Sequence, residues 1–194
     1  MKIENYKIEN SEVLIKPKLL LHSCCAPCST STYDFFIQNN NVDLFWFNPN
    51  VYPQEEQDKR LSEVRRLSEI IGCEVVEEIT SQADHEAWKK FISGTEREPE
   101  GGKRCHLCYE YRMKKAFAIA KKNEYGGVTT SLLVSPYKDQ KKIKEIGNKL
   151  AKQYDVKFFF EDFKGIDGYS QSIKLSKKYG LYRQKYCGCE FSLR

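Results

Sequence analysis

Short apolar runs alternate along this chain with stretches in which apolar residues recur at the helical period. The runs have the length of strands and occupy residues 18–22, 42–47, 73–77, 126–135 and 156–160. This alternation is the pattern of a parallel sheet covered by helices on both faces. We therefore predict an α/β fold with a single doubly wound, mostly parallel, five-stranded sheet and helices on both faces.

The helical stretches show recognisable start and stop signals. Ser29 and Ser31 are hydroxyl residues of the type that caps a helix, so we expect the first helix to open near one of them. The second helix should begin around Gln54 and end at Gly72, a residue typical of the C′ position. Further helices are expected at residues 84–92, 105–122, 139–153 and 167–179.

Two segments fall outside this alternation. Residues 93–104 are rich in glycine and charge and predict an insertion loop, and residues 181–194 form a basic tail that contains cysteine. No segment resembles a linker that would divide the chain, and 194 residues are enough for one core. We predict one domain, residues 1–194.

The charge pattern bears on location and partners. The start of the chain is charged, without the apolar segment of a signal peptide, and no apolar run reaches the ~18 residues of a membrane span, so we expect a cytoplasmic protein without a membrane partner. Residues 170–194 carry six lysines and arginines against Glu190, which accounts for the formal net charge of +5. Such a segment attracts polyanions such as RNA, although a solvated helix face gives the same pattern.

Seven of the eight cysteines are grouped at predicted loops or element ends. In a reducing compartment these thiols would be free for metal binding or redox chemistry. The groups are Cys24, Cys25 and Cys28; Cys105 and Cys108; and Cys187 and Cys189. Cys73 stands alone and is expected in the core.

The first group occupies the loop where a nucleotide-binding protein of this design places glycines. "SCCAPC" has no glycine and contains Pro27, which argues against a phosphate cradle. Adjacent thiolates must be compensated by a cation or stay protonated, and a metal is the economical compensation. Seven thiols exceed the four ligands of one zinc or one iron–sulfur cluster. A cluster with an adjacent metal, or a cluster with an open iron and spare redox thiols, fits this number better.

Other side chains are candidates for proton transfer and substrate binding. The candidate proton donors are Asp34, Tyr137, Lys138, His106 and Tyr186. His22 is expected to be a core histidine, and His85 is given no role. Aromatic rings next to positive charge suit an unpaired base and its phosphate, which indicates Lys138, Tyr182, Arg183 and Lys185 as substrate-binding residues beside Tyr137 and Tyr186. The alternative is that these tyrosines pack the tail on the sheet.

Five motifs in order resemble one known family. They are "LLLHSCCAPC", "NPNVYPQEE", "RCHLCYEYRM", "TTSLLVSPYK" and "YRQKYCGC", and together they look like the QueH-type epoxyqueuosine reductases over residues 18–190. The resemblance implies a single catalytic domain related in fold to the adenine-nucleotide α-hydrolase-like (HUP) and tRNA-thiolation enzymes. It also implies a [4Fe–4S] cluster and a nearby iron, held by Cys24, Cys25, Cys28, Cys105, Cys108, Cys187 and Cys189 in a division that the spacing leaves open.

The implied reaction removes the epoxide oxygen of epoxyqueuosine at the wobble position of tRNA, without cobalamin, and gives queuosine. Forming an alkene from an epoxide takes two electrons and two protons and releases water, so an external electron donor is also implied. Our hypothesis is that the cluster relays electrons, that an adjacent iron binds the epoxide oxygen, and that Asp34, Tyr137 or Tyr186 supplies protons. The competing interpretations are a tRNA-thiolation or ATP-pyrophosphatase-like enzyme and a zinc-stabilised RNA-binding module.

Overall fold

One parallel sheet organises the molecule in the computed structural model, which describes residues 16–78 and 80–192. Its strands are β1 (Lys18–His22), β2 (Asn41–Trp46), β3 (Val75–Glu77), β4 (Gly127–Thr130) and β5 (Lys157–Phe158). They lie in the order β3-β2-β1-β4-β5, and every pair is parallel. The predicted fold class is confirmed, with a sheet that is parallel throughout. The charged start of the chain and Arg194 lie outside the described residues.

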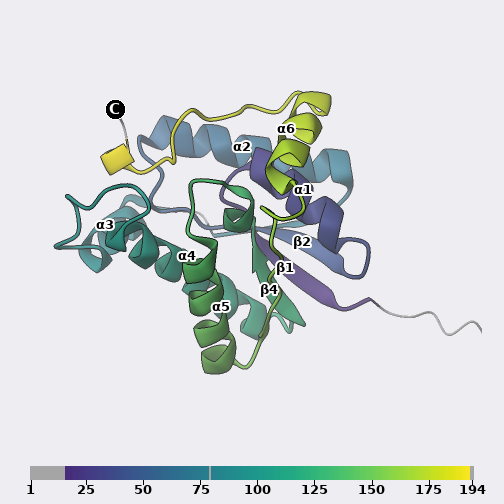
Figure 1. The fold of residues 1–194 in the computed structure, drawn as a ribbon, viewed down its shortest axis with the longest axis horizontal. Coiled ribbons are helices and arrows are strands. Elements are labelled where there is room, and N and C mark those ends of the chain that lie inside the picture. The colour runs from purple at the N-terminus through teal and green to yellow at the C-terminus, as the bar shows by residue number, and fades with distance from the viewer. Residues whose placement is uncertain (1–15, 79, 193–194) are drawn as a thin grey trace, which may run out of the picture.

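Helices cover both faces of the sheet (Figure 1). They are α1 (Ala26–Phe36), α2 (Gln54–Ile71), α3 (Gln82–Phe91), α4 (Lys103–Lys122), α5 (Gln140–Tyr154) and α6 (Gly168–Lys178), with the 3-10 helices η1 (Ser131–Val134) and η2 (Glu190–Ser192). Helix α1 packs against α2 and α6 on one face, and α4 packs against α5 and β1 on the other. The described part of the chain contains no helix that is both long and apolar enough to span a bilayer.

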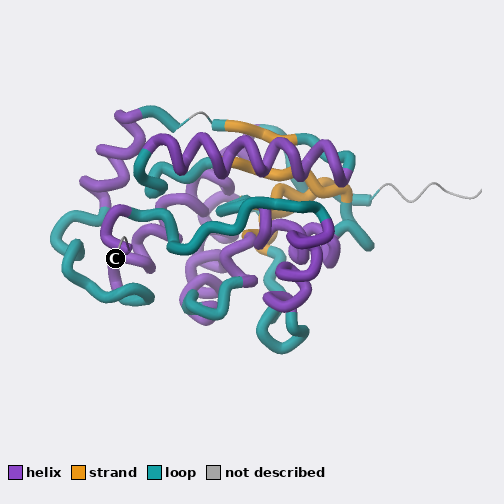
Figure 2. The backbone as a smooth tube through the Cα atoms, turned by 90° about the horizontal axis from the view of Figure 1, so that it is seen from above, coloured by secondary structure: helices purple, strands orange, loops and turns teal. Residues whose placement is uncertain are grey.

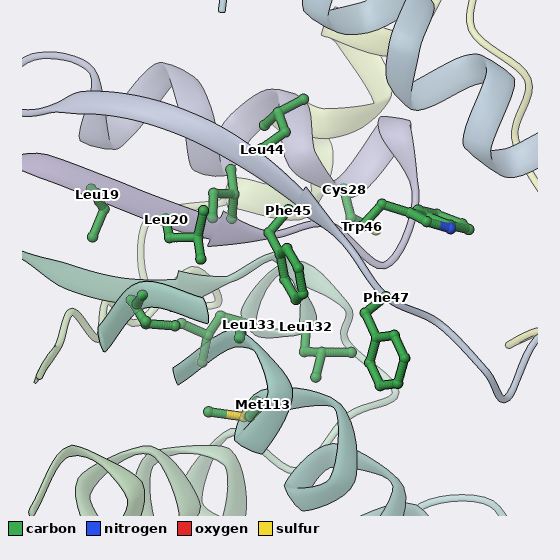
Figure 3. Packing of buried hydrophobic residues seen from close by; sticks show 14 of the residues in the cluster. Leu19, Leu20, Cys28, Leu44, Phe45, Trp46, Phe47, Met113, Leu132 and Leu133 are labelled. Carbon is green, nitrogen blue, oxygen red and sulfur yellow. The ribbon is translucent and has the colours of Figure 1, made fainter. Parts of the chain in front are cut away.

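The core lies between the sheet and these helices. Leu20 of β1 and Phe45 of β2 are fully buried, together with Leu132 of η1 and Met113 of α4 (Figure 3). Strands covered on both faces become apolar runs because each of their side chains meets a helix or a neighbouring strand. Burying one such side chain contributes about 1.5–3 kcal/mol, so the central strands are a rigid support for the loops at their ends.

The first helix starts earlier than the sequence suggested. Helix α1 begins at Ala26 with Cys25 as its N-cap, so the expectation of an opening near Ser29 or Ser31 is wrong. Pro27 fits the first turn, where its missing N–H is not needed. Ser29 lies inside the helix, and its hydroxyl donates to the Cys25 carbonyl at 2.9 Å. This early start places Cys28 on the first turn.

Other elements begin or end at residues that local hydrogen bonds and backbone geometry decide. The run 126–135 is only partly strand: β4 ends at Thr130, whose side chain accepts a hydrogen bond from Leu132 N, and η1 follows. A capping box between Ser81 and Asp84 starts α3 at Gln82, two residues before the predicted start. The Gly72 stop is confirmed, since this residue ends α2 with φ of +70°.

The tail runs back along α2 to the carboxyl ends of the strands (Figure 1). Arg66 donates to the carbonyls of Tyr179 and Gly180, and Arg60 donates to the carbonyls of Tyr186 and Cys187. The strands gather toward one end of the molecule and the C-terminal part of the chain lies toward the other (Figure 2). The tail thereby brings its cysteines to the loops that follow the strands.

Candidate metal centre and substrate cavity

The first cysteine group lies at the point where the strand order of the sheet reverses. Strand β1 pairs with β2 on one side and with β4 on the other, and crevices at such points are where open α/β sheets bind ligands. The Cys24 N–H donates to Ser131 Oγ at 2.9 Å, and the Ser131 hydroxyl donates to Cys24 Sγ at 3.1 Å. The ends of β1 and β4 therefore fix Cys24 together.

Cys24, Cys25 and Cys28 form a compact group of sulfur atoms. Their Sγ atoms all lie within 4.8 Å of one another, and the Cys24 and Cys25 sulfurs are 3.9 Å apart. Metal–sulfur bonds of about 2.3 Å let sulfurs at this spacing share one metal ion or cluster edge. Hydrogen bonding with Cys25 and Cys28 holds the pKa of Cys24 well below its usual range. The same interactions raise the pKa of Cys25 to about 12 and also raise that of Cys28.

The second and third groups meet next to this one. Cys108 of α4 and Cys189 of the tail are buried in one apolar cluster with Trp88. Cys187 lines the same cavity as Cys24 and Cys28. Across residues 16–78 and 80–192, however, the first group is the one set of three potential ligands that already lies within 4.8 Å. A single centre that draws on all three segments stays a prediction.

Two buried cations face the thiols. Arg112 is 2% exposed and Lys138 is 9% exposed, and among the described residues neither has a carboxylate partner within 4 Å. Lys138 Nζ donates to Cys187 Sγ at 3.6 Å, and Arg112 Nη1 donates to Asn48 Oδ1 at 2.9 Å while its Nε has no partner. Buried charge requires a counter-charge, and thiolates are the anions at hand. Seven sulfur donors beside unpaired buried cations fit an anionic iron–sulfur group.

A cavity of about 310 Å³ opens onto these groups. Cys24, Cys28 and Cys187 line it together with three tyrosines, five cations and one carboxylate. These other lining residues include Tyr137, Tyr169 and Tyr186; Arg60, Arg112, Lys138, Arg183 and Lys185; and Glu100. Thiols, aromatic rings and positive charge therefore share one hollow.

The cavity contains most of the predicted catalytic and substrate-binding residues, but two of them lie elsewhere. The Tyr182 hydroxyl donates to the Glu56 carboxylate, and its ring lies 3.6 Å from the Lys59 ammonium, so Tyr182 packs against α2. Asp34 is exposed near the end of α1 and lines a different cavity with Phe35. Sequence reasoning missed Arg112, although its spacing of four and seven residues from Cys108 and Cys105 puts it on the same face of α4.

The single residues behave largely as expected. His22 is fully buried with Nδ1 2.9 Å from Thr130 Oγ1, and burial together with the charge of Arg112 lowers its pKa to about 3. This confirms a core histidine. His106 is half-buried, 3.5 Å from Asp139. Cys73 is only half-buried and packs against the core, and burial raises its pKa to about 12.

Comparisons with known proteins show the family of this chain. A protein-family model described as epoxyqueuosine reductase QueH matches residues 19–194. The chain is 34% identical to the epoxyqueuosine reductase QueH of Staphylococcus epidermidis over 98% of its own length and 87% of that protein. It is 34% identical to the one from Thermotoga maritima, with 90% of each chain covered, and 31% identical to the one from Streptococcus pyogenes, with 93% and 72% covered.

Two solved structures resemble the fold more distantly. A predicted subunit of a tRNA methyltransferase from Methanocaldococcus jannaschii has a TM-score of 0.47 at 16% identity, with 84% of this chain and 76% of that chain covered. The U34-tRNA thiolase NcsA from Methanococcus maripaludis, with its [4Fe-4S] cluster, has a TM-score of 0.40 at 12% identity, with 84% and 68% covered.

Fold and site together define a cysteine-rich α/β protein whose thiols gather at the carboxyl ends of parallel strands. The match of the family model over residues 19–194 identifies the family within this class. The chain belongs to the epoxyqueuosine reductase QueH family, and it is therefore an oxidoreductase.

Proposed function

We propose that this enzyme reduces epoxyqueuosine in tRNA to queuosine without cobalamin, with an iron–sulfur cluster, an adjacent iron and electrons from an external donor. The observation that carries the proposal is the cavity in which Cys24, Cys28 and Cys187 lie among tyrosines and cations. Thiols suit iron, and the other side chains suit a base and its phosphate.

The cavity walls would bind the unpaired wobble nucleotide. Tyr137 is 74% exposed at the rim and is free to stack on a base. Arg183 and Lys185 also line the cavity and would hold the flanking phosphates. Arg183 is oriented by hydrogen bonds to Ser176 Oγ at 3.0 Å and to the Ser172 carbonyl at 3.4 Å.

Protons would come from groups that line the same cavity. Tyr137 and Tyr186 carry hydroxyls there, and the Tyr186 hydroxyl donates to the Tyr52 carbonyl. Lys138, held beside Cys187, keeps its proton: burial opposes its charge, but nearby thiolates outweigh burial and raise its pKa. Lys138 would therefore orient the departing oxygen through a hydrogen bond, and a tyrosine would protonate it.

The seven grouped cysteines would hold the metals. Cys24, Cys25 and Cys28 would supply ligands from the start of α1, Cys105 and Cys108 from the start of α4, and Cys187 and Cys189 from the tail. When bound, a cluster supplies single electrons and an adjacent iron supplies a Lewis acid for an oxygen atom. The surplus of thiols over the four that one cluster needs supports the second iron.

The test is anaerobic incubation of the purified protein with epoxyqueuosine-containing tRNA and a strong reductant, with no cobalamin, followed by mass analysis of the nucleosides. We expect queuosine to form. Cys28→Ser should abolish it, and Cys73→Ser, at a thiol outside the three groups, should not. No queuosine from the wild type at full iron content would refute the function, and four irons or fewer per chain would remove the second iron.

A further inference from the structure

Away from the thiols, which face Arg112 and Lys138, the charged lining of the cavity is mostly positive. Five cationic side chains line it, and one of them, Arg60, is neutralised by Glu56 at 2.7 Å. Glu100 is the one carboxylate among the described lining residues. Arg183 and Lys185, the lining cations without such an anionic neighbour, favour phosphate and repel a cation. A substrate that carries its own positive charge into the cavity therefore requires a negative partner.

A tight turn holds Glu100 at this position. The Gly102 N–H donates to the Pro99 carbonyl at 3.0 Å, and Gly101 has φ of +88°, the backbone that a type II turn demands of its third residue. The Gly101 N–H also lies 3.3 Å from Cys105 Sγ. The turn is thus tied to the second cysteine group.

Arg104 fixes the rest of this segment. Its guanidinium is buried and donates to the carbonyls of Glu96 and Glu98, with 2.7 Å to the former. The Glu100 carboxylate itself is exposed and has no hydrogen bond or ion pair with another described residue. Its backbone is therefore fixed while its charge stays available to a ligand.

The substrate of the proposed reaction carries a cation. Epoxyqueuosine has a secondary amine between its deazaguanine base and the ring that bears the epoxide, and an alkyl amine of this kind is protonated at neutral pH, as lysine is. When the epoxide reaches the thiols, this ammonium lies inside the cavity. Guanine, the base of an unmodified wobble position, has no such group.

We propose that Glu100 binds the protonated amine of epoxyqueuosine and thereby selects the modified tRNA over the same tRNA with guanine. This inference rests on the proposed function. One charge-assisted hydrogen bond between Glu100 and the amine accounts for about a tenfold preference. The cations of the cavity bind phosphates in both tRNAs and do not discriminate between them.

The experiment measures the affinity of the iron-loaded protein for the two tRNAs, anaerobically, without reductant and at one salt concentration. Wild type should prefer the epoxyqueuosine tRNA about tenfold. Glu100→Gln, which keeps the shape and removes the charge, should lose the preference by weakening only that tRNA. Glu98→Gln is the matched control, because it removes the same charge from the same loop outside the cavity lining.

Three results would overturn the proposal: a preference that Glu100→Gln retains, equal weakening of both tRNAs, or equal loss of preference in Glu98→Gln. A preference that survives Glu100→Gln excludes a contact between Glu100 and the amine. Equal weakening of both tRNAs means that Glu100 contacts a part that both share, the guanine edge or the tRNA backbone. Equal loss of preference in Glu98→Gln means that the negative charge of the loop, and not a contact of Glu100, causes the effect. Queuosine formation by the wild type is scored separately. If the wild type forms no queuosine but the affinity ratios are as expected, the proposed reaction is rejected. If the wild type forms queuosine but Glu100→Gln has the same affinity ratio as the wild type, only the role of Glu100 is rejected.

Discussion

Replacing Gly188 by alanine should open the cysteine tail without unfolding the domain. Gly188 lies between Cys187 and Cys189 with φ of +116°, where an L side chain costs about 1–3 kcal/mol. A Cβ there would also lie 2.6 Å from Arg60 Nη1, the atom that donates to the Cys187 carbonyl at 2.9 Å. Losing that hydrogen bond costs about 1.5–3 kcal/mol more.

The two effects add to about 2.5–6 kcal/mol, which raises the population of the open tail on the order of a hundredfold or more. Residues 181–189 of the tail lie outside the helices and strands, so we expect the tail to open locally and the thermal midpoint of the domain to change little. The assay is the rate at which a thiol reagent modifies metal-free protein. Cys189, 6% exposed in the closed tail, should react much faster in the variant.

Gly180→Ala is the matched control in the same tail. Gly180 also has positive φ, at +62°, but a Cβ there would approach only Arg66 Nη2, at 3.4 Å. It should cost about 1–2 kcal/mol and leave the rate at Cys189 almost unchanged. An equal reaction rate in wild type and Gly188→Ala, or a rate at Cys189 as fast in Gly180→Ala as in Gly188→Ala, would refute this reasoning.

Three further predictions concern stability and redox behaviour. Gly147→Ala should lower the thermal midpoint, although alanine has the better helix propensity. The added Cβ would overlap the Phe158 ring, and overpacking of this kind costs about 1–3 kcal/mol. An unchanged midpoint would contradict the packing of Gly147 against Phe158. A hydrogen bond from Arg65 lowers the pKa of Glu77, so this ion pair stabilises the fold above the ordinary Glu pKa and the stabilisation is lost as pH falls. In Arg65→Met the free energy of unfolding, measured with urea, should fall less steeply as pH drops, by under about 1 kcal/mol. A profile as steep as that of the wild type would exclude a stabilising ion pair between Arg65 and Glu77. Arg112→Met removes a buried cation facing the thiols and should make the iron-loaded protein harder to reduce in a spectroscopic titration; an unshifted midpoint potential would contradict it.

Local sequence signals predicted the elements well where the signal was itself local. The bounds of β1, the Gly72 stop and the helical stripe of α4 depend on residues within a few positions of each other. The start of α1 was missed because the Ser29 hydroxyl suggested a cap at that position. The helix instead begins directly after the loop that follows β1, with Pro27 in its first turn. Where two helix starts have local signals of similar strength, tertiary contacts decide between them.

Some residues of the candidate site could be predicted from the sequence, and others could not. The sequence identified the three cysteine groups and the aromatic and basic residues around them. It could not tell that Tyr182 packs on α2 while Tyr186 lines the cavity, since the two lie four positions apart in one irregular segment without a period. Nor did the sequence single out Arg112 among the many cations of the chain, because its burial depends on what covers it.

The sequence by itself determined an α/β chain with thiols at its loops, since hydrophobic period and turn chemistry act over short distances. Only the tertiary structure decided that Ser131 holds Cys24 and that Arg60 holds the tail, across separations of 107 and 127 residues. The strand order and the packing of α2 create these contacts, and no local pattern encodes them. The chemistry that we propose depends on that convergence.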